Sequence, residues 1–218
     1  MIGPILNMNQ PPNNHKISTL GYGSEALERV GRMLLRLIGW RVEAALPAES
    51  KLVLIVAPHT SNWDLPIGLI CAFAMGLMRN WRIGYLAKDS AVRWPVIGDV
   101  MRWFGAIPIN RRAANNLVEQ MAAIFRQHDR LLLGIAPEGT RKKTPYWKSG
   151  FYHIALKARV PIALAYLDYG RKVGGVGPTI MPTGNMEADL EIIRQFYAGI
   201  VGKFPHQFGE IQFKPSDI

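Results

Sequence analysis

Short apolar runs that are typical of buried strands alternate along this chain with segments that are typical of helices. The runs are rich in Val, Ile and Leu, as in residues 51–57 (KLVLIVA), and they end in Pro, Gly or a basic residue. Runs of this kind indicate parallel strands, which are buried on both faces and are joined by crossover helices. The alternation therefore predicts an α/β fold with a mixed, largely parallel sheet flanked by helices.

The pattern predicts the position of each element. We expect strands at residues 51–57, 82–87, 105–110, 130–136, 161–169 and 210–213. We expect helices at residues 24–42, 65–78, 115–128, 151–159 and 187–203. Ser24 and Ser149 precede two of these helices and are candidate N-caps.

The N-terminal part of the chain predicts a division into three segments. Residues 1–23 hold two prolines beside two asparagines and lack an apolar h-region, so we expect a flexible tail without a secretory signal. Residues 24–46 are expected to carry an amphipathic helix, in which Arg is interleaved with Leu, Met and Trp. That composition suits a helix in a lipid headgroup layer, or one packed on the domain with a basic outer face. Residues 47–218 are expected to form the main domain.

The net charge and the length of the apolar runs limit which classes of binding partner we expect for this protein. The chain has 26 Lys and Arg against 16 Asp and Glu, a net charge of +10, which points to anionic partners. Nucleic acid is disfavoured, because the basic residues are scattered and no aromatic RNA-binding stripe or recognition-helix motif is present. The uncharged run 65–78 is too short to span a bilayer. We therefore expect a protein that lies peripherally on the anionic, cytoplasmic face of a membrane, a setting that also suits the single cysteine, Cys71.

His59 and Asp64 follow the run 51–57 and are the first candidates for catalysis. In an α/β sheet, ligands gather beyond the carboxyl ends of the strands, and these two residues fall at that place. A carboxylate beside an imidazole fixes its tautomer and stabilises its protonated form, so the free ring nitrogen can act as a general base on a hydroxyl. The spacing alone is also compatible with a structural role, in which Asp64 caps a helix and His59 makes ordinary hydrogen bonds.

Two further polar clusters follow expected strands. Arg111 and Arg112 come directly after the run 105–110, and adjacent guanidinium groups suit phosphate binding or a solvated turn. Residues 137–141 (PEGTR) come after the run 130–136, where Gly139 permits a tight turn. Arg141 could hold a phosphate and Glu138 could order it or bind a hydroxyl, although a surface turn with a salt bridge is the alternative.

The order of these blocks resembles the glycerolipid acyltransferase family. HTSNWD, GAIPINRR, APEGTR and VPIALAYLDY follow one another as the four sequence blocks of that family do, from residue 53 to residue 169. The pairing of H-x4-D with E-G-T-R at this separation is the specific part of the resemblance. The chain departs from the family pattern at Pro58, Ala136 and Lys142, where Asn, an aromatic residue and Ser are frequent.

The resemblance implies an enzyme of phospholipid biosynthesis, a transferase that moves a fatty acyl group from acyl-CoA or acyl-carrier protein to a hydroxyl of a lysophospholipid. The implied acceptor is 1-acyl-glycerol-3-phosphate, with another lysolipid, of phospholipid or ornithine-lipid type, as the alternative. His59 would be the general base and Asp64 would orient it. Arg111, Glu138, Gly139, Thr140 and Arg141 would bind the acceptor. No metal or bound cofactor is implied, and the transfer would be direct, without an acyl-enzyme.

Two functions of a different class remain open on the residues alone. A thioesterase would use the same His–Asp pair with water as the acceptor, but water needs no phosphate site. A basic nucleic-acid-binding module would fit the net charge, but it leaves the apolar run 65–78 unexplained.

Overall fold

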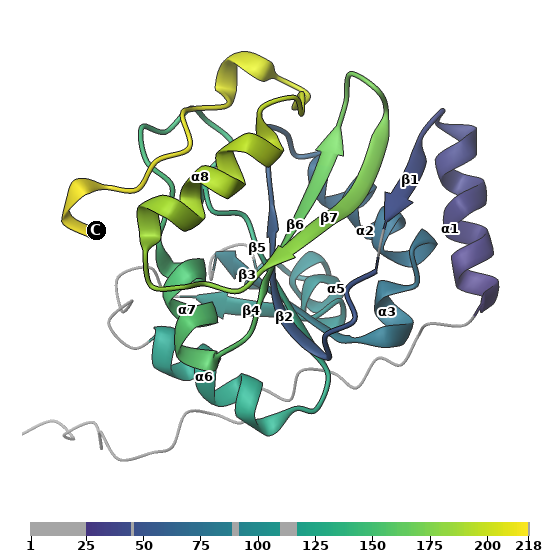
Figure 1. Ribbon diagram of the computed structural model, residues 1–218. Helices are drawn as coiled ribbons and strands as arrows, with labels where there is room; N and C mark the ends of the chain where they lie inside the picture. Colours follow the sequence, from purple (N-terminus) through teal and green to yellow (C-terminus); the bar gives the residue numbers. More distant parts are fainter. Residues whose placement is uncertain (1–24, 45, 89–91, 110–116, 218) are drawn as a thin grey trace, which may run out of the picture.

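The computed structural model describes residues 25–44, 46–88, 92–109 and 117–217. These residues form a seven-stranded sheet in the order β1-β7-β6-β2-β5-β3-β4, with helices on both faces (Figure 1). The strands are β1 (Arg41–Ala44), β2 (Lys51–Val56), β3 (Arg82–Lys88), β4 (Ala106–Ile109), β5 (Leu131–Ile135), β6 (Ile162–Asp168) and β7 (Val173–Ile180). The α-helices are α1 (Glu25–Leu37), α2 (Asp64–Ala74), α3 (Leu77–Asn80), α5 (Ile97–Trp103), α6 (Leu117–Gln127), α7 (Gly150–Ala158) and α8 (Met186–Tyr197), and two short 3-10 helices lie at Pro205–Gln207 and Pro215–Asp217.

The sheet is mixed and largely parallel, which confirms the predicted fold class. β4, β3, β5, β2 and β6 run parallel, whereas β7 is antiparallel to β6 and β1 is parallel to β7. β2 lies in the middle, with Val53 opposite Leu133 of β5 and Ile162 of β6. The carboxyl ends of β6, β2 and β5 therefore lie side by side at one edge of the sheet.

Alternate residues of the central strands supply the two faces of the core. Val53 and Ile55 belong to the cluster that α6, α7 and α8 cover, together with Trp147 and Phe213. Leu52 and Leu54 point to the other face, where Leu77 of α3 packs on them. Full burial of one such aliphatic side chain stabilises the fold by roughly 1.5–3 kcal/mol. The two-residue period of the strands thus explains why runs such as KLVLIV carry no polar face.

The predicted helix over residues 24–42 is too long at its C-terminal end. α1 ends at Leu37, Gly39 takes a left-handed φ of 72°, and residues 41–44 leave the helix to form β1. A left-handed residue is a common end to a helix, and glycine adopts that conformation without strain. β1 pairs with β7, so this segment belongs to the sheet. Ser24 and the expected tail at residues 1–23 lie outside the described residues.

The C-terminal region also departs from the prediction. α8 ends at Tyr197, not at residue 203, and residues 210–213 form no strand but one bridge between Trp147 and Phe213. Ser149 makes no capping bond, because its φ of −69° and ψ of −8° are helical, whereas an N-cap residue needs non-helical angles. Its hydroxyl donates to Asp217 Oδ2 at 2.8 Å. The strands β1 and β7 and the helix α5 were not predicted.

α1 packs against α2 with an unusual distribution of polarity. Its buried residues are Glu28, Gly31 and Leu35. Glu28 accepts a hydrogen bond from Arg32 and forms an ion pair with Arg79, each at 3.1 Å. Apart from Leu35, the large apolar residues of α1 face outward, with Leu37 75% exposed. Within the described part of the chain, no helix has both the length and the apolar composition that crossing a bilayer requires.

Candidate active site

The edge of the sheet at which β6, β2 and β5 end carries the candidate site. The turn after β2 presents His59, the turn after β5 presents Glu138, and the residue after β6 is Tyr169. Because these three strands are neighbours and run parallel, side chains from distant parts of the sequence meet here.

His59 and Asp64 lie in direct contact. His59 Nδ1 is 3.0 Å from Asp64 Oδ2, and the Asp64 residue is only 4% exposed. With its proton on Nδ1, the ring donates to Asp64 and presents the lone pair of Nε2. The His59 side chain is 21% exposed, so a substrate hydroxyl can reach the ring. The structure thus brings together the two residues that the sequence predicted as a catalytic pair.

Four donors hold the Asp64 carboxylate. Oδ2 accepts the backbone N–H groups of Thr60 at 2.9 Å and Ser61 at 2.8 Å besides His59, and Oδ1 accepts the hydroxyl of Tyr169 at 2.7 Å. Burial of the Asp64 carboxyl raises its pKa, but the hydrogen bonds from His59, Tyr169 and the Ser61 backbone outweigh burial and bring the pKa below the ordinary value. Asp64 is therefore ionised at neutral pH and positioned to stabilise an imidazolium.

Glu138 binds the backbone of the loop that carries His59. Its Oε1 accepts the N–H of His59 at 2.6 Å, and the residue is 2% exposed. Its Oε2 is buried and has no hydrogen-bond partner among the described residues. Burial raises the pKa of Glu138 to about 8; the His59 N–H opposes this rise and the nearby charge of Asp64 adds to it. Glu138 was predicted to bind the acceptor, which stays a prediction; the contact that the structure shows is with the loop of His59.

The rest of the PEGTR turn is more open. Gly139 has a left-handed φ of 64° and donates its N–H to Ala136 O at 3.0 Å, a turn that a side chain would strain. Thr140 Oγ1 accepts the N–H of Lys142 at 3.2 Å. The Arg141 side chain is exposed, and no carboxylate among the described residues forms an ion pair with it. This leaves the guanidinium of Arg141 available to an anionic ligand.

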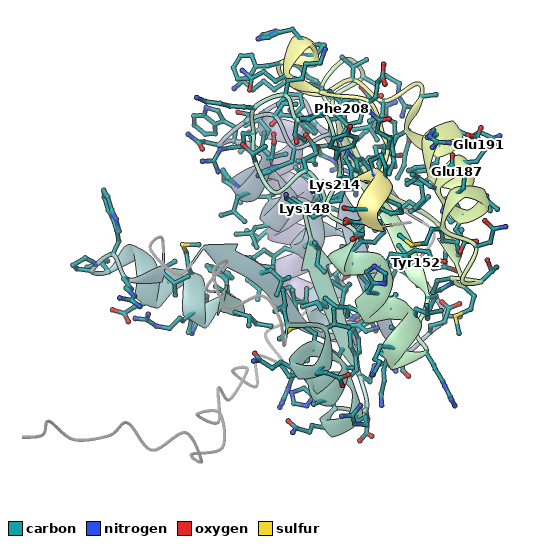
Figure 2. The ribbon with its side chains drawn as sticks, turned by 90° about the vertical axis from the view of Figure 1, so that its left-hand side faces the viewer. Lys148, Tyr152, Glu187, Glu191, Phe208 and Lys214 are labelled. Atoms are coloured by element: carbon teal, nitrogen blue, oxygen red, sulfur yellow. The ribbon has the colours of Figure 1, made fainter. Side chains whose placement is uncertain are left out.

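Other basic groups surround this turn. Lys148, labelled in Figure 2, donates its backbone N–H to Pro137 O at 2.8 Å and so fixes the exit of the turn. Lys142 and Lys143 are exposed beside Arg141. The predicted phosphate-binding residues Arg111 and Arg112 lie outside the described residues, so their place relative to His59 stays a prediction.

The segment 202–207 completes the surroundings of the loop and was not predicted. Phe204 donates its N–H to Thr60 Oγ1 at 3.2 Å, and Gln207, with its amide nitrogen toward the loop, donates to Thr60 O at 3.3 Å and to Arg141 O. Lys203 Nζ lies 5.3 Å from the ring centroid of Trp63. No motif marks this segment in the sequence. Tyr169, by contrast, could have been found from its position at the end of a parallel strand.

The described residues offer no obvious metal centre. No group of three or more His, Cys, Asp or Glu side chains among them is arranged to hold an ion. The expectation of a site without metal or bound cofactor stays a prediction. What the arrangement can do by itself is general-base chemistry at Nε2 of His59, supported by an ionised Asp64.

The chain is similar to known acyltransferases. A family model described as Acyltransferase matches residues 40–166, more than half of the chain. A 1-acyl-sn-glycerol-3-phosphate acyltransferase from Borreliella burgdorferi is 31% identical over 121 residues, which cover 54% of this chain and 45% of that protein. The chain thus spans about half the length of the curated relative that it matches.

A solved structure shares the fold. The crystal structure of the 1-acyl-sn-glycerophosphate (LPA) acyltransferase PlsC from Thermotoga maritima superposes with a TM-score of 0.53 over 82% of this chain and 80% of that one. The two sequences are 15% identical, so this likeness concerns the fold alone.

Proposed function

Because this chain belongs to the Acyltransferase family, we propose that it transfers a fatty acyl group from a thioester to the hydroxyl of a phosphorylated glycerol lipid. The observation that carries the proposal is the His59–Asp64 pair at 3.0 Å, with Asp64 ionised and the ring open to solvent. The proposed acceptor is 1-acyl-glycerol-3-phosphate, as in the relative from Borreliella burgdorferi, and the proposed donor is acyl-CoA or acyl-carrier protein.

The geometry supports a direct transfer. Nε2 of His59 takes the proton of the acceptor hydroxyl while the oxygen of that hydroxyl forms a bond to the thioester carbonyl carbon. Asp64 stabilises the imidazolium that results. The tetrahedral intermediate then collapses, its carbon–sulfur bond breaks, and the imidazolium returns the proton to the leaving thiolate. The products are the acylated lipid and a free thiol, and no acyl-enzyme forms.

The acceptor's phosphate would be bound by basic residues near the PEGTR turn. Arg141 is exposed and free of carboxylate partners among the described residues, which supports this role. A thioesterase that uses water as the acceptor has no need of such a group. Arg111 is included in the proposed phosphate site on the family resemblance.

The reaction is tested with purified protein, labelled palmitoyl-CoA or palmitoyl-carrier protein, and a panel of acceptors. The panel holds no acceptor, glycerol-3-phosphate, lysophosphatidate and lysophosphatidylcholine, and the products are separated by thin-layer chromatography. With lysophosphatidate as the acceptor, we expect label in phosphatidate. This label is expected to be lost in His59→Ala and kept in His153→Ala, which replaces a histidine on α7. Label found only in free fatty acid would mean that the protein is a thioesterase. Transfer of label to another acceptor would mean that the proposed acceptor is wrong.

The proposal includes the place of the reaction, the anionic cytoplasmic face of a membrane. α1 supports it, because its outward residues combine exposed apolar side chains with arginines, a pattern suited to a headgroup layer. The exposed apolar residues of and just after this helix are Leu27, Val30, Met33, Leu34, Leu37 and Ile38. Nucleic acid is not among the proposed partners.

Vesicle binding tests this location. Co-sedimentation with phosphatidylcholine vesicles containing phosphatidylglycerol is expected to be strong for the wild type and much weaker for Met33→Glu/Leu37→Glu. The matched control is Ile192→Glu on α8, which also replaces an exposed apolar residue. Equal binding by all three proteins would contradict the assignment to α1.

A further inference from the structure

Tyr169 is held at the end of β6 by its backbone. Its N–H donates to Val201 O at 2.8 Å, which ties it to the segment after α8. The next turn is fixed by Asp168, whose Oδ1 accepts the N–H groups of Gly170 at 2.9 Å and Arg171 at 3.2 Å. The direction in which the Tyr169 side chain leaves the sheet is therefore set by contacts on both sides of the residue.

The ring of Tyr169 is held as well. The buried Trp40 packs against it edge to face, with centroids 4.9 Å apart and an interplanar angle of 86°. Lys203 Nζ lies 6.0 Å from the same ring. Two residues that are distant in sequence thus fix a ring whose hydroxyl ends 2.7 Å from Asp64 Oδ1.

The hydrogen bond to Oδ1 determines how the Asp64 carboxylate is turned. Oδ2 accepts from His59 and from the backbone of the loop, whereas Oδ1 accepts from Tyr169, which follows β6. Two oxygens held from different parts of the chain oppose rotation of the carboxylate about the Cβ–Cγ bond. The bond also withdraws negative charge from Asp64, and it lowers the pKa of that carboxyl. Burial and the bond to Asp64 raise the pKa of Tyr169 well above its ordinary value, so the hydroxyl stays a donor.

We propose that Tyr169 is a positioning residue of the active site, whose hydroxyl holds Asp64 in the orientation that pairs it with His59. The inference rests on the proposed function for its catalytic meaning, but the contact itself does not depend on the substrate. The titratable and charged groups around this contact are His59 and Glu138 at the ends of the neighbouring strands, Cys71 on α2 and Lys203 after α8.

The test removes one oxygen atom. Tyr169→Phe keeps the ring that packs on Trp40 and deletes only the donor to Asp64. The matched control is Tyr152→Phe: Tyr152 lies on α7 (Figure 2), and its hydroxyl donates to Asp189 Oδ2 at the same distance of 2.7 Å. Both variants lose a tyrosine–aspartate hydrogen bond, so a loss of thermal stability alone cannot distinguish them.

Steady-state kinetics across pH give the first readout. In Tyr169→Phe we expect kcat to fall about tenfold with unchanged KM for both substrates, because a hydrogen bond to a charged group is lost and binding is untouched. The acid limb of the kcat profile is expected to move to higher pH, because an Asp64 that keeps more of its charge stabilises the imidazolium more strongly. Tyr152→Phe is expected to keep the wild-type profile. An unshifted profile in Tyr169→Phe, or an equal shift in both variants, would overturn the inference.

A second readout does not need turnover. The NMR signal of the His59 Nδ1 proton, which faces Asp64 Oδ2, is recorded at one pH in the three proteins, and we expect it to shift in Tyr169→Phe alone. If the wild type showed no acyl transfer, the proposed function would fail, and this NMR comparison would still decide whether Tyr169 positions Asp64. An unchanged signal in Tyr169→Phe, or an equal shift in both variants, would refute the positioning role, whatever the activity.

Discussion

Replacement of Glu138 by Gln tests whether a neutral, buried acid lies beside the catalytic loop. The residue is 2% exposed and its Oε1 accepts the N–H of His59, while Oε2 has no partner in the described part of the chain. Burial raises its pKa from the ordinary 4.5 to about 8. Near neutral pH the folded protein therefore holds this carboxyl largely protonated, whereas the unfolded chain ionises it.

The sign and size of the effect follow from this difference. Because the folded-state pKa is the higher one, the contribution of Glu138 to stability is fully present below pH 4.5 and is lost as the pH rises to about 8. Each pH unit in that interval lowers the free energy of unfolding by about 1.4 kcal/mol, so the loss approaches about 5 kcal/mol across it. Glutamine cannot ionise, so Glu138→Gln lacks this loss while its side-chain oxygen can still accept from His59.

The measurement is urea unfolding of both proteins at pH 5.5, 6.5, 7.5 and 8.5. The free energy of unfolding of Glu138→Gln minus that of the wild type is expected to increase by about 3 kcal/mol over this range. Glu210→Gln, which replaces an exposed glutamate, is the control and is expected to give a difference independent of pH. A constant difference for Glu138→Gln as well would mean that this acid is ionised in the folded protein and that the reasoning is wrong.

Three other substitutions probe separate parts of the molecule. Asp64→Asn is expected to keep the fold and to lower kcat on the order of a thousandfold, measured beside the circular dichroism melting curve, because the His59 tautomer is no longer fixed; turnover near the wild-type rate would contradict the pair. Arg141→Ala is expected to raise KM for a phosphorylated acceptor by about tenfold and to leave KM for the acyl donor unchanged; an equal rise in both would refute the phosphate assignment. Gly31→Ala is expected to destabilise the protein by about 1–3 kcal/mol in urea unfolding, since the new methyl would lie 2.8 Å from the backbone N of Ala74 and push α1 from α2; unchanged stability would show that the two helices separate freely.

The sequence predicted the central sheet well because its strands are buried on both faces. The predicted ranges 51–57, 82–87, 130–136 and 161–169 each match an observed strand to within one residue at either end. The rule that ligands gather at the carboxyl ends of parallel strands also predicts His59 and Glu138 at one edge of the sheet.

The sequence did not predict β7, because close packing against neighbouring elements, and not strand propensity, determines which residues the strand contains. Its sequence, VGGVGPTI, holds three glycines and a proline, which are unusual in strands. A Cβ at Gly174 would lie 2.4 Å from Cys71 Sγ, and one at Gly175 would lie 2.3 Å from Glu43 O. α2 and β1 approach the strand so closely that only glycine fits, and this crowding is visible only in three dimensions. β1 was mispredicted as helix for the related reason that its partner, β7, was unknown.

The residues of the candidate site also differ in whether they are close in sequence or meet only in the folded chain. His59, Asp64 and Glu138 lie within the segment that matches the Acyltransferase family model, and the catalytic pair is only five residues apart, so sequence alone could propose it. Tyr169 and residues 202–207 lie beyond that segment, yet they contact Asp64 and Thr60 directly. Tyr169 is the last residue of the block VPIALAYLDY, but its contact with Asp64 and the contact of Phe204 with Thr60 depend on how β6 and the chain after α8 return to the loop. The sequence pattern therefore does not reveal these contacts. Under the proposed mechanism, differences among relatives in the orientation of the His–Asp pair are therefore expected to arise in these later residues, while the H-x4-D motif supplies the proposed base.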